Sequence, residues 1–156
     1  MRKRSSYRPR RVLANPMSYV LAGMESVKTH SSHILDLQLK NHNAMAALTQ
    51  GKATRADIDL LVAMVNMVEA LWRLGFGQEY REEVDAGLDA LHTVGSRGAA
   101  TSKFILRSSE MEALNTIMDL HDAQMEIITI KDLENAMEII RKEERSKRMR
   151  PMKATT

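Results

Sequence analysis

Residues 54–74 read TRADIDLLVAMVNMVEALWRL and predict the most apolar helix of the chain. Thr54 and Asp57 have the spacing of a capping box, in which a hydroxyl and a carboxylate satisfy the first free backbone amides of a helix. Apolar residues then follow two seams of helical spacing: Ile58, Leu61, Val65, Val68 and Trp72 on one, and Leu60, Met64, Met67 and Leu71 on the other. A helix with two apolar seams is buried on most sides, so this segment predicts the centre of an all-α fold.

Two further helices are expected on the N-terminal side of this segment. The pair Asn15-Pro16 predicts a helix over 15–28, because Asn is a good N-cap and Pro suits the first helical position. One face of that helix is apolar: Met17, Val20, Leu21 and Met24. A polar joint at 29–33 leads into a second helix over 34–50, in which Leu35, Leu39, His42, Met45 and Leu48 are three or four residues apart. Gly51 is placed to end it in a left-handed turn.

On the C-terminal side, Gly75 and Gly77 predict a turn, followed by an amphipathic helix over 78–94. Its inward face is expected to consist of Tyr80, Val84, Leu88 and Leu91. Gly95 is expected to end this helix. Residues 95–103 are small, polar and basic, and predict a mobile loop.

The last part of the helical region predicts two helices with a break between them. Ser109 and Glu112 form a second capping-box pattern, which opens a helix that reaches Ile128. The apolar seam changes phase there, so a break is expected near Thr129. A final helix then continues into the basic C-terminal end. No convincing strand occurs, and the expected fold is a compact bundle of five or six helices.

Charge divides the chain into three parts: a basic arm at 1–14, a single helical domain at 15–140 and a basic helical tail at 141–156. Six of the first eleven residues are Lys or Arg, and none is acidic. Residues 12–140 instead hold ten Lys or Arg and eighteen Asp or Glu, although the whole chain carries +3. Basic ends on an acidic body predict a polyanionic partner. The alternative is that the ends pack on acidic surfaces of the same chain or of a sister copy.

Composition excludes several classes of protein. Without cysteine the chain has no disulfide, no thiolate zinc site and no cysteine nucleophile. The longest uncharged stretch, 12–24, is interrupted at Asn15-Pro16 and is shorter than the roughly 20 apolar residues of a spanning helix. We therefore expect no membrane partner and no cleaved N-terminal signal.

One residue pair raises the question of an enzyme. His121-Asp122 resembles the His-Asp pair of the all-helical HD phosphohydrolases, which also need an upstream His and a distant Asp for their metal. The upstream ligand would come from His92, His30, His33 or His42, but the sole downstream Asp, Asp132, is only ten residues away. His121 also lies on an apolar seam, which favours a buried structural role. We expect no enzyme activity, no metal and no cofactor.

Three other patterns have a functional and a structural interpretation. Gly95-Ser-Arg-Gly98 matches the G-x-x-G loop of KH domains, but the sheet of that fold is missing and a flexible loop is the better interpretation. The turn at 50–57 would suit a helix–turn–helix, yet the helix after it is too apolar to read bases. The carboxylates at 79–89 are better explained as a solvated helix face than as an acid/base pair.

Methionine is abundant, with twelve residues, and Met111, Met118 and Met125 lie one heptad apart. Such a stripe most often belongs to a core. The alternatives are an adaptable groove for a partner or a seam between two copies.

Several segments resemble small helical proteins encoded by bacteriophages and prophages. They are Tyr7-Arg-Pro9 within the basic arm, the segment Asn15 to Gly23 (NPMSYVLAG), and the segment Leu39 to Met45 (LKNHNAM). The resemblance implies a bacterial cytoplasm and an accessory or regulatory role. It supplies no catalytic site.

The sequence therefore predicts a non-enzymatic, phage-type protein that associates with nucleic acid through its basic ends and that can form a homo-oligomer. The alternative is an inhibitor or adaptor that binds a host protein through acidic helices or the Met seam. The residues expected to contact phosphate are Arg2, Lys3, Arg4, Arg8, Arg10, Arg11, Arg97, Lys103, Arg141, Lys142, Arg145, Lys147, Arg148 and Arg150.

Overall fold

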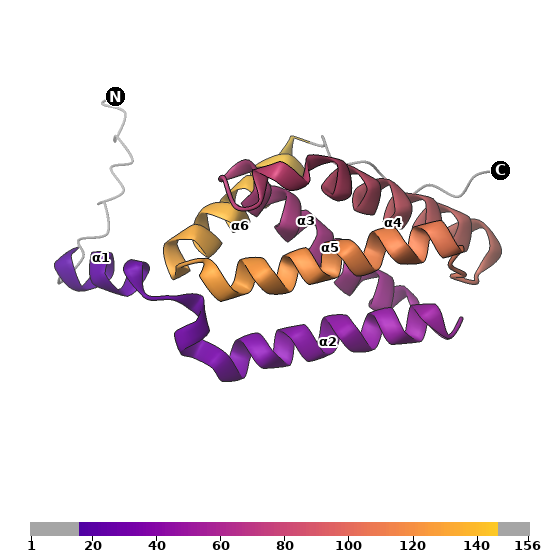
Figure 1. Ribbon diagram of the computed structural model, residues 1–156, viewed down its shortest axis with the longest axis horizontal. Coiled ribbons are helices and arrows are strands. Elements are labelled where there is room, and N and C mark those ends of the chain that lie inside the picture. Colours follow the sequence, from indigo (N-terminus) through magenta and orange to yellow (C-terminus); the bar gives the residue numbers. More distant parts are fainter. Residues whose placement is uncertain (1–15, 147–156) are drawn as a thin grey trace, which may run out of the picture.

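Apolar periodicity builds six α-helices between residues 16 and 146, the part of the chain that the computed structural model describes (Figure 1). In chain order the elements are α1 Pro16–Met24, the 3-10 helix η1 Val27–His30, α2 Ser31–Thr49, α3 Arg55–Arg73, the 3-10 helix η2 Gln78–Tyr80, α4 Arg81–Thr101, α5 Ser108–Ile127 and α6 Ile130–Arg145. Within this range no strand forms, and the one β-type pairing is an isolated bridge between Ser26 and Thr129. The predicted all-α class is confirmed.

The helix at the centre is α3, as the sequence predicts, and it contacts α2, α4, α5 and α6. Ile58, Leu61 and Val68 on its first seam are fully buried. The predicted capping box is present: the Thr54 amide donates to Asp57 Oδ2 at 2.7 Å, and the Asp57 amide donates to Thr54 Oγ1 at 3.4 Å.

Two apolar clusters hold the bundle together. The larger joins α2, α3, α4 and α5 and includes Leu48, Leu61, Val94 and Leu114. The smaller joins η1, α3, α5 and α6, and its centre is formed by residues such as Leu71 and Met125. The two clusters lie along α3, which explains why this helix is apolar on two seams.

Helix α4 corrects one prediction. It continues through Gly95 and Gly98 to Thr101, so residues 95–101 are helical and the expected mobile loop is wrong. A G-x-x-G loop is therefore absent as well. The reason is close packing: a Cβ placed on Gly98 would come within 2.0 Å of the Phe104 ring, so the missing side chain lets the chain fold back tightly on α4. Tyr80, expected to face inward, is 43% exposed.

The start of α5 is a second correction. The helix begins at Ser108 with Arg107 as N-cap, and Glu110 rather than Glu112 occupies the third helical position. The Arg107 amide donates to Glu110 Oε2 at 2.8 Å. The predicted Ser109–Glu112 box does not form because the Glu110 carboxylate already accepts this hydrogen bond.

The predicted break near Thr129 is confirmed. α5 ends at Ile127, and Thr129 caps α6. The Thr129 amide donates to Asp132 Oδ2 at 2.8 Å, and the Asp132 amide donates to Thr129 Oγ1 at 3.2 Å. The connection between α5 and α6 is hydrogen-bonded to the chain around the start of η1. The Val27 amide donates to the Ile128 carbonyl at 3.0 Å, and the Ile130 amide donates to the Glu25 carbonyl at 2.9 Å.

The first predicted helix is shorter than expected. α1 ends at Met24, η1 occupies 27–30, and α2 begins directly after it at Ser31. Figure 1 shows α1 at one end of the molecule, beside the elbow between α5 and α6 and before the start of α2. Among the contacts between the described helices, α1 packs on α6.

Candidate nucleic-acid interface

The described body is acidic. Residues 16–146 contain all twenty Asp and Glu residues of the chain and thirteen of its twenty-three Lys and Arg residues. The other ten basic residues belong to 1–15 and 147–156, where there is no acid. The basic excess of the whole chain is therefore confined to its two ends.

Nine of the residues expected to contact phosphate lie outside the described residues: Arg2, Lys3, Arg4, Arg8, Arg10, Arg11, Lys147, Arg148 and Arg150. The structure places the other five at two separate sites. Arg97 and Lys103 lie on α4 and the connection after it, and Arg141, Lys142 and Arg145 lie on the last turns of α6.

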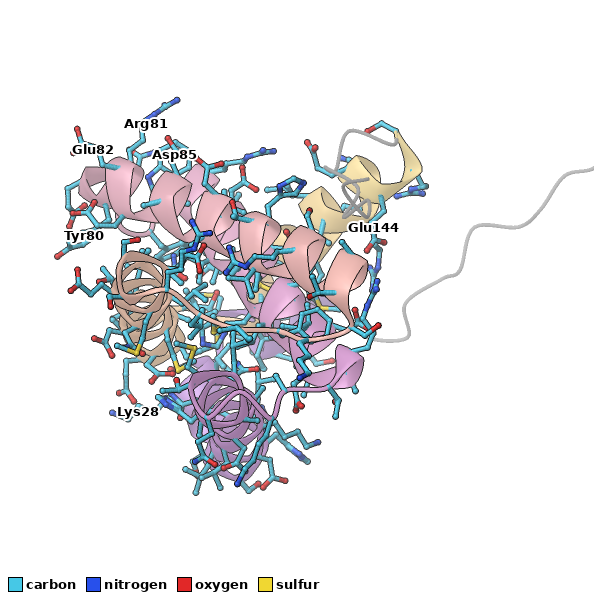
Figure 2. All side chains as sticks on the ribbon, turned by 90° about the vertical axis from the view of Figure 1, so that its right-hand side faces the viewer. Lys28, Tyr80, Arg81, Glu82, Asp85 and Glu144 are labelled. Carbon is cyan, nitrogen blue, oxygen red and sulfur yellow. The ribbon has the colours of Figure 1, made fainter. Side chains whose placement is uncertain are left out.

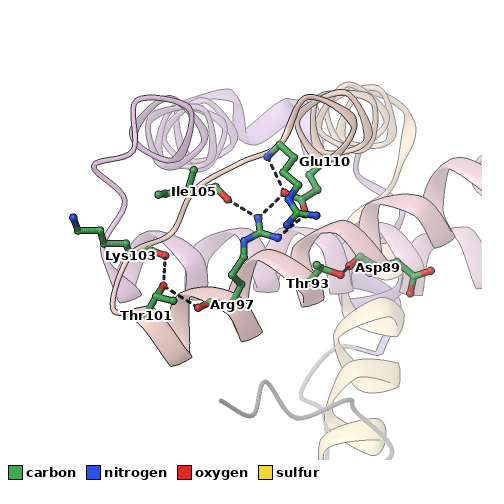
Figure 3. Close-up of polar contacts among 8 residues, drawn as sticks. Asp89, Thr93, Arg97, Thr101, Lys103, Ile105 and Glu110 are labelled. Carbon is green, nitrogen blue, oxygen red and sulfur yellow. Dashed lines mark hydrogen bonds and ion pairs between the residues drawn. The ribbon is translucent and has the colours of Figure 1, made fainter. Parts of the chain in front are cut away.

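Arg97 is held by the protein itself (Figure 3). Its two terminal nitrogens donate to the two carboxylate oxygens of Glu110 at 2.9 and 2.7 Å, and Nη2 also donates to the Ile105 carbonyl at 2.6 Å. The hydrogen bonds from Arg97 hold the pKa of Glu110 below its ordinary value, and the same contact raises the pKa of Arg97. This bidentate pair fastens the connection between α4 and α5. Arg97 therefore cannot contact phosphate without breaking it.

Lys103 lies on the same connection but is exposed. Its backbone carbonyl accepts a hydrogen bond from Thr101 Oγ1 at 3.1 Å, as Figure 3 also shows. Among the described residues its ammonium group forms no ion pair, so Lys103 stays available to an anion.

The described part of the C-terminal tail is partly neutralised. Arg141 and Arg145 both lie near Glu138, at 3.9 and 3.2 Å. Glu143 receives Arg73 Nη1 at 3.0 Å, which ties α6 to α3. Lys142 is exposed and, within the described chain, is in no ion pair. Of the three basic residues expected here, Lys142 alone is unengaged by a described carboxylate.

The acidic surface lies on α4 and α5. α5 contains five acidic residues and no Lys or Arg: Glu110, Glu112, Asp119, Asp122 and Glu126. At the start of α4, Glu82 and Asp85 point outward beside Arg81 and Tyr80 (Figure 2). The Arg81 guanidinium lies 5.4 Å from the centre of the Trp72 ring. Both carboxylates are exposed, which agrees with a solvated face rather than an acid/base pair.

His121 has the buried position that its seam predicts, and it is 1% exposed. Burial lowers its pKa below the ordinary value, an effect that Asp122 partly opposes, so the ring is neutral at pH 7. Asp122 instead accepts from α2: Gln38 Nε2 lies 3.2 Å and His42 Nε2 lies 2.8 Å from its oxygens. These contacts join α2 to α5.

Three of the residues considered for an HD-type metal site lie together, because Asp122 is 2.8 Å from His42 Nε2 and 3.7 Å from His121 Nδ1. Asp132 and His30 do not join them. Asp132 caps α6, as described above, and His30 lies 3.4 Å from Glu25 in the segment before α2. Within residues 16–146, no group of three or more His, Asp or Glu side chains is arranged to hold a metal ion. The arrangement of these residues gives no support to a metal phosphohydrolase.

The Met seam of α5 belongs mainly to the core. Met118 and Met125 are buried, and Met111 packs partly buried against the larger cluster. A partner groove built on these side chains would require the bundle to open, so the core interpretation holds.

Comparison with known proteins identifies no relative. The chain matches no protein-family model, no curated protein and no solved structure. Among the helices of residues 16–146, none combines the length and the apolar character that crossing a membrane requires.

Proposed function

We propose that this chain is a non-enzymatic, phage-type nucleic-acid-associated protein of the bacterial cytoplasm, which binds the phosphate backbone through its basic ends. The observation that carries the proposal is the division of charge. Every acidic residue lies within 16–146, and residues 1–15 and 147–156 contain ten Lys or Arg and no acid. A body of this charge repels a polyanion, so the contacts belong to the ends.

The ion pairs of the body support this division. Eight of its thirteen Lys and Arg residues lie within 4 Å of a described carboxylate: Lys28, Arg55, Arg73, Arg81, Arg97, Lys131, Arg141 and Arg145. Arg97 therefore leaves the proposed interface. Lys103 and Lys142 remain as secondary contacts, and the six basic residues of the arm are the principal ones.

Contacts of this kind predict weak sequence specificity, because phosphate contacts position a protein without reading bases. Arg side chains of the arm suit a minor groove, where the negative potential is strongest. The role of the helical body is to hold the arm and the tail at fixed starting points.

The test is a salt titration of binding to labelled duplex DNA, with RNA as a second probe. About six phosphate contacts predict a log–log slope of the association constant near −5. Replacing Arg8, Arg10 and Arg11 by Gln should reduce the slope to about −3. The matched control replaces Lys40, Lys52 and Arg55 by Gln. It removes the same charge from the exposed body and should keep the slope near −5. Absence of binding at low salt, or equal effects of the two triple variants, would contradict the proposal.

The acidic surface favours one alternative, an inhibitor or adaptor that binds a host protein. The exposed carboxylates of α5, including Glu112, Asp119 and Glu126, form a surface free of Lys and Arg on that helix. Deleting residues 1–11 separates the two functions: loss of partner capture supports nucleic acid, and retention supports the protein partner. A pull-down from host lysate with and without nuclease gives an independent answer.

A further inference from the structure

α1 presents an apolar face to solvent. Its four large apolar side chains, Met17, Val20, Leu21 and Met24, are 54–68% exposed. They are spaced three, four and seven residues apart and so share one side of the helix. No residue of α1 is charged. Gly23 lies off this face and close to Lys131 of α6, so α1 contacts the bundle there while its apolar face is open.

Other exposed apolar residues gather at the same end of the molecule. Leu35 and Leu39 on the first half of α2 are 56% and 51% exposed, and Ile127 at the end of α5 is 64% exposed. Among the described residues, eight large apolar side chains are more than half exposed. Seven of them lie in α1, the first half of α2 and the end of α5, and we call them the end patch. Figure 1 shows these three segments at one end of the bundle.

The end patch is expected to be covered by another surface. A helix as short as the nine residues of α1 is marginal in water unless tertiary packing covers its apolar face. Apolar residues concentrated on one surface mark a contact site, whereas single exposed residues do not. The isolated Ile105, 56% exposed at the connection between α4 and α5, is such a single residue and serves as a control.

The charges of the surfaces that could cover the end patch favour a second copy of the chain. Residues 1–15 and 147–156 contain ten Lys or Arg residues, and burying these charges against an apolar face would be costly. A second copy fits the face of α1, because an uncharged helix can face its own copy without bringing like charges together. The acidic faces of α4 and α5 would repel their copies.

We propose that the end patch is the interface of a two-fold symmetric homodimer. In such an interface the same surface of each copy pairs with its counterpart. A stable interface covers roughly 800 Å² on each partner. Nine residues of α1 are too few for that area, so Leu35, Leu39 and Ile127 take part. The small interface predicts a reversible dimer with a dissociation constant on the order of micromolar.

The consequence for the two basic arms follows from the sequence. Each arm directly precedes α1, so a dimer through the end patch unites twelve arm Lys and Arg residues in one particle. If the arms bind nucleic acid as proposed above, the dimer binds more tightly than the monomer through multivalency. The dimer itself does not depend on that function.

The first test is the mass of the full chain by light scattering or sedimentation equilibrium, up to about 100 µM. We expect a dimer for the wild type and a monomer for Leu21→Glu, which places a charge at the centre of the end patch. Ile105→Glu, with the same change at a similarly exposed site, should stay dimeric. A monomeric wild type, or equal dissociation by both variants, would overturn the proposal.

The second test is positive and uses the absence of cysteine. Val20→Cys supplies a single thiol on the face of α1 and should form a disulfide-linked dimer under mild oxidation, since two thiols near a two-fold axis approach closely. Ile105→Cys should not. A monomer that instead floats with phosphatidylglycerol vesicles and loses this with Leu21→Glu would assign the end patch to lipid and overturn the dimer. Nuclease treatment leaves both readouts unchanged, which separates them from the proposed function.

Discussion

α1 and α3 are both apolar helices, yet they have opposite environments. α3 is enclosed by four other helices and buries residues such as Ile58, Leu61 and Val68 completely. α1 packs on α6 and leaves Met17, Leu21 and Met24 at least 59% exposed. An apolar helix face therefore indicates that another surface packs against it. The neighbouring elements determine whether that surface belongs to the same chain.

The largest expected effect compares one Leu from each helix. Leu61→Ala should lower the free energy of unfolding by about 3 kcal/mol, because it removes a fully buried side chain and leaves a cavity. Leu21→Ala should change it by no more than about 0.5 kcal/mol, because the side chain is already in water. The measurement is urea unfolding at about 1 µM protein, where the proposed dimer is largely dissociated.

The same two variants at higher protein concentration test whether the face of α1 is buried in a dimer. Above the dissociation constant the wild type should gain stability by mass action, and Leu21→Ala should gain less. A loss for Leu21→Ala at low concentration as large as that for Leu61→Ala would show that α1 is buried within the monomer.

The next effect compares two ion pairs, one between α4 and α5 within the bundle and one between η1 and α5 at the end near α1. The side chains of Arg97 and Glu110 are 26% and 11% exposed, and those of Lys28 and Glu126 beside η1 are 65% and 54% exposed. Glu110→Gln should cost about 2 kcal/mol, since it leaves a partly buried guanidinium without its charge partner and weakens the cap of α5. Glu126→Gln should cost roughly 0.5 kcal/mol or less.

Chemical denaturation of both single variants checks these values. The double variant Arg97→Met, Glu110→Gln should lose less than the sum of its single variants, because the two side chains act on each other. Additive losses would mean that the bidentate contact contributes nothing to stability.

The smallest expected effect is a dependence of the free energy of unfolding on pH, caused by the buried His121 of α5. His121 is buried with a lowered pKa, and its surroundings include Asp122, which favours the charged ring, and His42, which opposes it. The unfolded chain takes up this proton near pH 6.5, and the folded chain does so only at lower pH. The contribution of His121 to the free energy of unfolding is therefore complete above about pH 6.5 and is lost as the pH falls below it.

Unfolding free energies between pH 5 and pH 7.5 test this sign. His121→Gln should reduce the slope against pH, whatever its effect on absolute stability. His33→Gln, which alters an exposed His at the start of α2, should retain the wild-type slope. A steeper slope for His121→Gln would reverse the assignment.

Local signals predicted much of the fold. The capping box at Thr54 is predictable because it depends on two residues three positions apart, and the break near Thr129 is predictable from the change of phase of the apolar seam. The buried position of His121 followed from its place on an apolar seam. The charge division also needed no structure, since it is a count along the chain.

The errors share a physical cause. Residues 95–101 look like a loop because Gly, Ser and Ala lack side-chain signals, but the Phe104 ring packs against Gly98 and favours a helix there. Arg97 looked available to phosphate, and Glu110, thirteen residues away, engages it. The exposure of Leu35 and Leu39 could not be predicted from the sequence, because helical spacing does not show which of two apolar sides of a helix packs against the core.

The helical class, the break near Thr129 and the separation of an acidic body from basic ends can all be predicted from the sequence alone. These depend on periodicity, capping and composition, which are properties of neighbouring residues. Tertiary contacts determine that the face of α1 is open and that Arg97 is engaged, neither of which the sequence predicts. Each of these depends on contacts between residues that only folding brings together.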